Sequence, residues 1–188
     1  MSRIEELRQA RAGMNAVRER IYGLAEGRSD AELLRVPTTG GWCAAEVIDH
    51  LRTAESKLVK GLVKVGRGER VNLPRLCWYY RLPMGIAFVP FKIEAPKPVR
   101  PKAAADIRPQ EAVEGLRSSR RDLLAFADTI GEEKFAKFLF PHFLLGRFDG
   151  LDWFRFLTRH EARHEAQMKR ILSGSMATHP LGGGAGEP

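Results

Sequence analysis

The chain has 188 residues, a net charge of +8 at neutral pH and a sequence pI of about 9.9. A chain of this length is expected to form one domain with a core large enough to be stable without disulfides. Hydrophobic residues make up 44% and charged residues 29%, which is typical of a globular protein and not of a disordered or fibrous one. The longest apolar run, at 82–91, is too short to span a bilayer and contains two prolines, so we expect no membrane association.

The cysteines and the first residues indicate where the protein is located. Cys43 and Cys77 do not form a Cys-x-x-Cys pair, and so few cysteines favour a reducing compartment. The opening stretch, MSRIEEL, is polar and does not resemble a secretory signal. We therefore expect a cytoplasmic protein.

The excess of positive charge raises nucleic acid as a candidate partner. However, Lys and Arg residues are spread along the chain, usually close to Glu or Asp. The densest basic stretch, 97–102, contains prolines and no aromatic residues. This pattern is typical of a solvated basic surface, so we do not expect nucleic acid to bind.

Four segments have apolar residues at the three- and four-residue spacing of amphipathic helices. They cover about 4–24, 43–65, 110–130 and 149–171. In the last segment, Asp149 and Asp152 have the spacing of a capping box at a helix start. No segment alternates convincingly as a strand does. The sequence therefore predicts an all-α fold, a four-helix bundle.

The segment between the second and third predicted helices, 66–108, is unusually long and rich in proline. A connection of this length suggests a crossover and not a tight hairpin. Its apolar part, 76–93, contains five aromatic residues that either cover an open side of the bundle or form a lid or a dimer surface. Residues 173–188 are glycine-rich, so we expect a bundle over 1–172 followed by a disordered tail.

The fourth predicted helix contains the stretch 160-HEARH-164, in which two histidines lie about one helical turn apart. His160 and His164 share a face with Leu157, Met168 and Ile171, so both imidazoles are expected to point into the core. Buried imidazoles need hydrogen bonds or a metal ion. A stacked pair on an apolar face favours metal ligation over hydrogen bonding alone.

The same stretch matches the His-Glu-x-x-His motif of zinc proteases, in which Glu161 would be the general base. A protease would also need a third ligand downstream. Only a short segment follows His164, and the one later histidine, His179, lies in the glycine-rich tail. We therefore interpret the match as a coincidence.

A third candidate ligand lies upstream, in the second predicted helix. His50 falls between Val47 and Leu51 on the apolar face, so it can also point into the interior. Three histidines from two facing helices would form a zinc-type site with one or more positions open to water or substrate. Three imidazoles suit zinc, nickel, copper or iron.

Two separated motifs resemble the DinB/YfiT-like superfamily. The pattern Gly-Trp-x-x-x-Glu-x-x-x-His-Leu resembles the second helix of that superfamily, and His-x-x-x-His-x-x-Gln resembles its last helix. The stretch 141–153 is similar to the approach to the last helix. The resemblance covers the chain from the first predicted helix to about Leu172. The matching residues are Trp42, Glu46, His50, Leu51, His160, His164 and Gln167.

This resemblance implies a crossover four-helix bundle, often dimeric, that binds a divalent metal ion such as zinc or nickel through His50, His160 and His164. Characterised relatives include metal-dependent transferases acting on low-molecular-weight thiols, in which the metal lowers the pKa of the thiol. We therefore expect a homodimeric transferase whose substrate is a small thiol. The alternatives are a metal-dependent hydrolase and a non-catalytic metal- or ligand-binding stress protein.

Other residues near the motifs are weaker candidates. Glu46 could orient a ligand or act in catalysis, but capping the helix is the simpler role. Glu161 could be a general base, although a solvated position is simpler. Gln167 could hydrogen-bond within the site, and His142 could line its mouth or lie on a surface loop. Cys43 stands where the family commonly has Ser or Thr, and it is either a tolerated small residue or a thiol with a lowered pKa.

Overall fold

The computed structural model describes residues 1–69, 97–142 and 146–174. Four long helices dominate these ranges: α1 (Arg3–Ala25), α3 (Ala44–Gly66), α4 (Pro109–Ile130) and α6 (Gly150–Leu172). The shorter elements are α2 (Asp30–Leu33), α5 (Glu132–Ala136) and the 3-10 turns η3 (Lys97–Val99) and η4 (Ala104–Asp106). The described ranges contain no strand beyond one isolated bridge between His142 and Gly146. The expected all-α class is confirmed.

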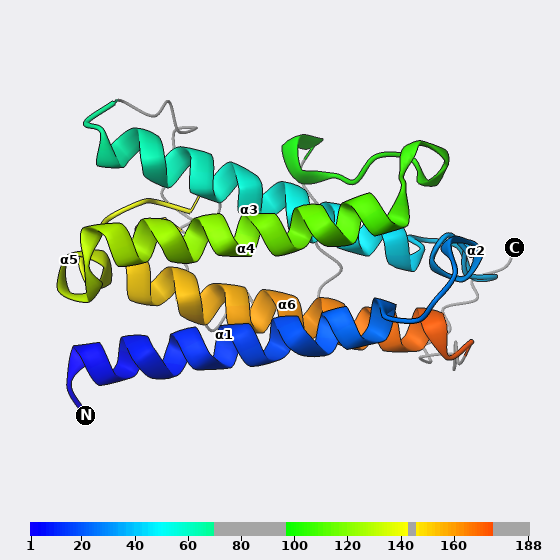
Figure 1. Ribbon diagram of the computed structural model, residues 1–188, viewed down its shortest axis with the longest axis horizontal. Coiled ribbons are helices and arrows are strands. Elements are labelled where there is room, and N and C mark those ends of the chain that lie inside the picture. Colours follow the sequence, from blue (N-terminus) through cyan, green and yellow to red (C-terminus); the bar gives the residue numbers. More distant parts are fainter. Residues whose placement is uncertain (70–96, 143–145, 175–188) are drawn as a thin grey trace, which may run out of the picture.

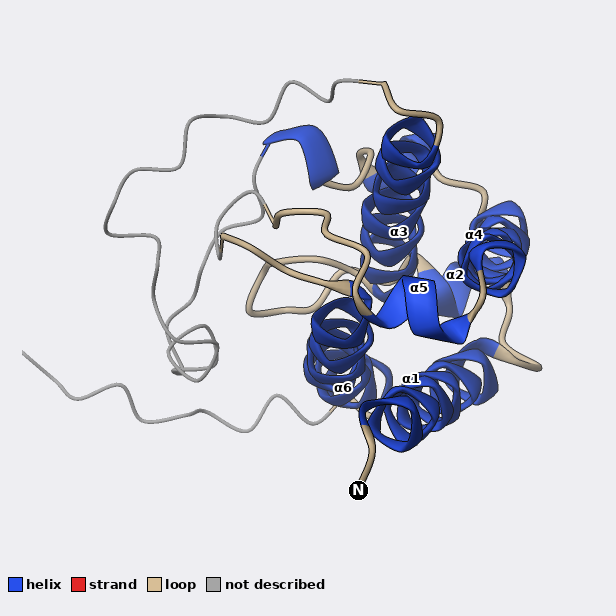
Figure 2. Cartoon of the chain, turned by 90° about the vertical axis from the view of Figure 1, so that its left-hand side faces the viewer, coloured by secondary structure: helices blue, strands red, loops and turns tan. Residues whose placement is uncertain are grey.

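The long helices form two parallel pairs (Figure 1). α1 and α6 lie side by side and run in one direction, and α3 and α4 lie side by side and both run in the opposite direction. Seen along the bundle, the four helices surround a common interior (Figure 2). α3 ends at one end of the bundle and α4 begins at the other, so these two consecutive long helices are parallel and do not form an antiparallel hairpin. The apolar stretch 76–93, with Cys77, and the tail from 175 onward lie outside the described residues.

Local signals account for the limits of the long helices. Ser2 forms a capping box with Glu5 at the start of α1, and Asp149 forms the predicted capping box with Asp152 at the start of α6. Gly131 follows α4 with a φ of 82°, in the left-handed region that favours glycine. The predicted limits differ from these helices by about one residue at each end. The sequence does not indicate α2 and α5, because such short segments show no helical period.

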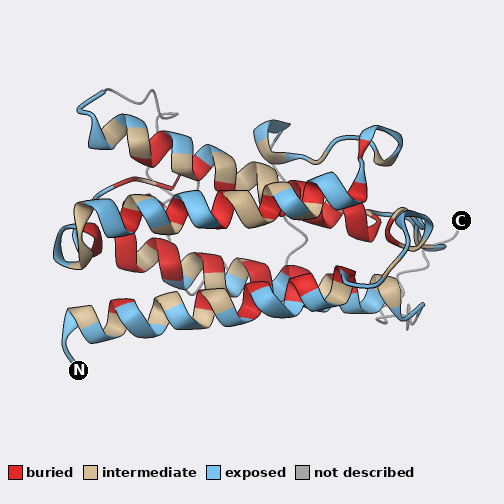
Figure 3. Cartoon of the chain, in the orientation of Figure 1, coloured by how far each residue is buried: buried red, intermediate tan, exposed pale blue. Residues whose placement is uncertain are grey.

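Buried residues, most of them apolar, lie on the inner faces of the long helices, and exposed residues lie on the outer faces (Figure 3). The buried apolar residues form two clusters, one towards each end. None of the helices in the described ranges has the length and apolarity that crossing a membrane requires. The first cluster includes Val17, Leu51, Leu116 and Met168, and the second includes Met14, Leu58, Leu123 and Leu157.

A buried ion cluster lies between the two apolar clusters and joins all four long helices. It consists of Arg18 from α1, Glu55 from α3, Arg120 from α4 and Glu161 from α6. Arg18 donates to Glu55 Oε2 at 3.0 Å and to the two Glu161 oxygens at 2.6 and 3.1 Å. Arg120 donates to Glu55 Oε1 at 2.8 Å and also to Glu161. The hydroxyl of Ser119 completes the cluster by donating to Glu55 at 2.6 Å.

These hydrogen bonds offset the cost of burying four charged groups. Burial acts to raise the pKa of Glu55, but the guanidinium groups of Arg18 and Arg120 outweigh it and hold that pKa below its usual value. Burial raises the pKa of Glu161, against the opposing effect of the same two arginines. The expected solvated position of Glu161 is wrong, because its side of α6 faces α1 and α4 and not solvent.

Replacing Glu55 by Gln is expected to lower the free energy of unfolding by about 3–5 kcal/mol. An amide cannot neutralise Arg18 and Arg120, and its N–H groups would face other donors. Urea unfolding followed by circular dichroism measures this loss. Asp128→Asn is the control, because it removes an exposed ion pair with Arg11 and should change stability little. Equal losses in the two variants would show that the ion cluster does not carry this stability.

Candidate metal centre

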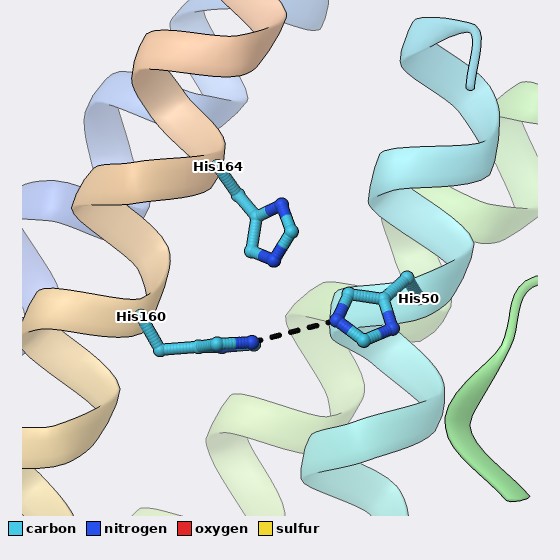
Figure 4. A group of neighbouring side chains, drawn as sticks. All are labelled: His50, His160 and His164. Atoms are coloured by element: carbon cyan, nitrogen blue, oxygen red, sulfur yellow. Dashed lines mark hydrogen bonds between the residues drawn. The ribbon is translucent and has the colours of Figure 1, made fainter. Parts of the chain in front are cut away.

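Three imidazole rings meet between α3 and α6 (Figure 4). His50 extends from α3, His160 and His164 extend from successive turns of α6, and one ring nitrogen of each lies within 4.8 Å of the others. His50 Nε2 and His160 Nε2 are 3.4 Å apart. Two nitrogens on one tetrahedral zinc ion are about 3.3 Å apart, because each Zn–N distance is about 2.0–2.1 Å. The group could therefore hold a metal ion after small movements of the rings.

A backbone carbonyl orients the His50 ring. His50 Nδ1 lies 2.6 Å from the carbonyl oxygen of Val99 in η3. Because a carbonyl only accepts hydrogen bonds, Nδ1 carries the hydrogen and the neutral ring keeps a lone pair on Nε2. This Nε2 is the atom that faces His160. The tautomer is therefore the one that ligation through Nε2 requires.

The two histidines of α6 are also held by neighbours. His164 Nδ1 lies 2.9 Å from Gln167 Oε1, so it donates to the amide oxygen and leaves its Nε2 lone pair free for a ligand role. The His160 ring stacks on Phe156 with ring centroids 5.4 Å apart and an angle of 15° between the planes. Since His50 Nε2 is an acceptor, His160 Nε2 donates the hydrogen bond between them. A bound metal ion would replace this hydrogen bond.

The indole of Trp42 packs against two of the three rings. Its centroid lies 5.1 Å from that of His50 and 6.4 Å from that of His164, and it is nearly parallel to His164 at 17°. Gly40 and Gly41, with φ of 76° and 94°, form the turn before Trp42 in the left-handed region that favours glycine. The turn leads the chain into α3 with the indole beside the histidines.

Burial keeps the three imidazoles neutral. It lowers the pKa of His164 to about 3 and places the pKa of His160 well below its usual value. Burial also lowers the pKa of His50, although the Val99 carbonyl and the Asp49 carboxylate act in the opposite direction. Metal ions bind the neutral form of imidazole. At neutral pH the site therefore offers three uncharged imidazole rings as metal ligands.

His142 lies in an apolar cage next to the three histidines. Its side chain is buried, and its ring contacts Phe148, Trp153 and Phe156 at centroid distances of 4.6 to 5.3 Å. Phe156 also stacks on His160, so its ring contacts both His142 and one of the three ligand histidines. Burial lowers the pKa of His142 to about 4. The alternative that His142 lies on a surface loop is wrong, because aromatic residues before and within the first turns of α6 enclose its ring.

The two weak catalytic candidates already have partners. Glu46 accepts a hydrogen bond from the Cys43 backbone N–H at 2.8 Å, which confirms its capping role in α3. Glu161 is held by Arg18 and Arg120 in the ion cluster. Among the described residues, neither carboxylate belongs to the group of possible metal ligands, which consists of the three histidines. Cys43 is buried, and burial raises the pKa of its thiol, which is the opposite of an activated cysteine.

Sequence reasoning expected Gln167 to hydrogen-bond within the site, as it does with His164, but it missed other groups that contact the ligands. Val99 contributes a backbone oxygen from a distant segment, so no side-chain pattern could have indicated it. Trp42 belongs to a family motif, but its packing on His50 and His164 follows only from the turn before α3. Asp49 was also missed, because an acidic residue beside a histidine on a helix is ordinarily solvated and here it is buried.

Comparisons with known proteins agree with this architecture. A family profile described as the DinB superfamily matches residues 14–168. The chain is also 29% identical over 158 residues to the uncharacterized protein YuaE of Bacillus subtilis (strain 168), an alignment that covers 84% of this chain and 93% of YuaE. No solved structure gives a significant match. Since the profile covers most of the chain and the fold is a helical bundle, the protein belongs to the DinB superfamily.

Proposed function

We propose that this protein binds one divalent metal ion, zinc or nickel, through His50, His160 and His164 and uses it to transfer a group to a small thiol. The observation that carries the proposal is the convergence of three neutral ring nitrogens within 4.8 Å of one another inside the bundle. Ring nitrogens this close together can share one metal ion, which would replace the hydrogen bond between His50 and His160.

The surroundings hold each ligand ring before a metal ion binds. Val99 and Gln167 set the tautomers of His50 and His164, and Phe156 stacks on His160. Hydrogen-bonded partners of this kind are usual around metal-binding histidines and increase their affinity. Three imidazole nitrogens suit zinc or nickel better than magnesium or calcium, which prefer oxygen ligands.

Three protein ligands leave at least one coordination position for a substrate. A divalent metal ion at such a site supplies Lewis acidity, which lowers the pKa of a coordinated thiol so that a thiolate is available at neutral pH. The neutral imidazoles leave the charge of the ion uncompensated, which favours an anionic nucleophile. The choice of a small thiol follows from the resemblance to characterised thiol transferases. His160 is the most exposed of the three ligands, so we expect the substrate to enter from its side.

Protein purified without an affinity tag is expected to contain about one metal ion per chain, and His50→Ala is expected to lose most of it. Elemental analysis of the two proteins measures the difference. His142→Phe is the matched control, because it removes a neighbouring histidine but keeps an aromatic ring in the apolar cage. Equal and near-zero metal contents in the wild type and His50→Ala, even after incubation with zinc or nickel, would rule out the site.

Metal affinity is expected to stay nearly constant between about pH 7.5 and pH 6. Because burial lowers the pKa of all three ligands, protons compete with the metal only at lower pH. A site of exposed histidines would already lose affinity near pH 6.5, the usual pKa of histidine. Chelator competition at a series of pH values measures the dissociation constant. A steep loss of affinity starting near pH 7 would contradict the buried, neutral state of the ligands.

The metal-loaded protein is expected to accelerate reaction of one or more small thiols with an electrophile, and His50→Ala is expected to lose this acceleration. A panel of low-molecular-weight thiols with alkylating and epoxide electrophiles, followed by loss of free thiol, provides the measurement. Turnover of an ester or amide without any thiol would instead indicate metal-assisted hydrolysis. Bound metal without turnover of either kind would indicate a non-catalytic binding protein.

A further inference from the structure

Asp49 immediately precedes His50 in α3, and its side chain is buried. It does not belong to the group of possible metal ligands, which consists of the three histidines. Both of its carboxylate oxygens have partners. Oδ2 accepts a hydrogen bond from the backbone N–H of Lys102 at 3.0 Å. Oδ1 accepts from Nη2 and Nε of Arg52 at 2.6 and 3.1 Å. Asp49 therefore ties α3 to a segment that lies far away in the sequence.

The segment in question is 97–102, with the sequence KPVRPK, and it includes the carbonyl that orients His50. Its two prolines have no N–H group, so the segment has few backbone donors with which to bind α3. Hydrogen bonds fasten it to α3 at three described points: Lys57 donates to the Pro98 carbonyl, His50 donates to the Val99 carbonyl, and Lys102 donates to Asp49. Of the two contacts that flank Val99, the one with Asp49 involves a buried carboxylate, whereas Lys57 is exposed.

We propose that Asp49 is a positioning residue for the metal site, which acts on His50 through the 97–102 segment. By anchoring Lys102, Asp49 keeps the Val99 carbonyl 2.6 Å from His50 Nδ1 and so selects the tautomer with the lone pair on Nε2. Without the anchor, the carbonyl moves away, and the His50 ring is free to rotate and to carry its hydrogen on Nε2. The effect on metal affinity rests on the proposed function, but the effect on the tautomer does not.

The tautomer of His50 in the metal-free protein tests the structural part directly. Nitrogen-15 NMR of the histidine rings is expected to show hydrogen on Nδ1 of His50 in the wild type, and a mixture of tautomers in Asp49→Ala. Asp49→Asn retains an oxygen that can accept from Lys102, and the half-exposed Arg52 can turn to solvent, so this variant is expected to restore the wild-type tautomer. Lys102→Pro removes the donor of the same hydrogen bond and is expected to behave like Asp49→Ala.

Metal affinity provides the second measurement. Chelator competition with zinc is expected to show about 10- to 100-fold weaker binding for Asp49→Ala and Lys102→Pro than for the wild type, with Asp49→Asn close to the wild type. Asp128→Ala is the matched control, because it removes an exposed aspartate with an arginine partner far from the histidines. If Asp49→Ala does not fold, Asp49→Asn and Lys102→Pro decide the question between them.

The outcomes separate this proposal from the proposed function. A wild-type tautomer and wild-type zinc affinity in both Asp49→Ala and Lys102→Pro would overturn the positioning role. Equal damage in Asp49→Asn and Asp49→Ala would also overturn it, since the charge and not the anchor would then matter. If wild-type protein binds neither zinc nor nickel, the proposed function fails, and the NMR measurement alone still confirms or refutes the role of Asp49.

Discussion

The bundle is organised around four charged side chains that meet at its centre. Arg18 and Glu161 join α1 to α6, and Arg120 and Glu55 join α4 to α3. The contacts of Arg18 with Glu55 and of Arg120 with Glu161 then cross from one helix pair to the other. A buried charge without its partner costs several kcal/mol, so sliding any one helix along the others is strongly unfavourable. Apolar clusters above and below provide the burial energy, but they tolerate such sliding far better.

The positions of the helices along one another, which the ion cluster fixes, also decide where the histidines meet. His160 directly precedes Glu161 in α6, and His50 lies little more than one turn before Glu55 in α3. When both glutamates share the two arginines, His50 is carried to a position opposite His160 between α3 and α6. The two polar groups of the interior differ in one respect. The ion cluster satisfies its own charges, whereas the histidines bring three uncharged imidazole rings together, which is an arrangement that a cation can complete.

Much of the fold and part of the site can be predicted from the helical spacing of apolar residues. The four long helices, the capping box at Asp149 and the inward direction of His160 and His164 depend on residues a few positions apart, so local spacing predicts them. The inclusion of His50 needed a second helix, and its apolar neighbours were enough to place it on an inner face. The same reasoning put Glu161 in solvent, because a glutamate on a helix is usually exposed and its arginine partners come from α1 and α4.

By itself, the sequence determined the helices, their apolar faces and three histidines able to point inward, because each follows from the geometry of one helix. Only the tertiary structure decided which polar groups meet across helices. It placed Glu161 among the arginines, His142 inside an aromatic cage, and the Val99 carbonyl on His50. The reason is physical: hydrogen bonds to a backbone oxygen or to a buried charge depend on distances between segments far apart in the chain. No spacing within a single segment encodes those distances.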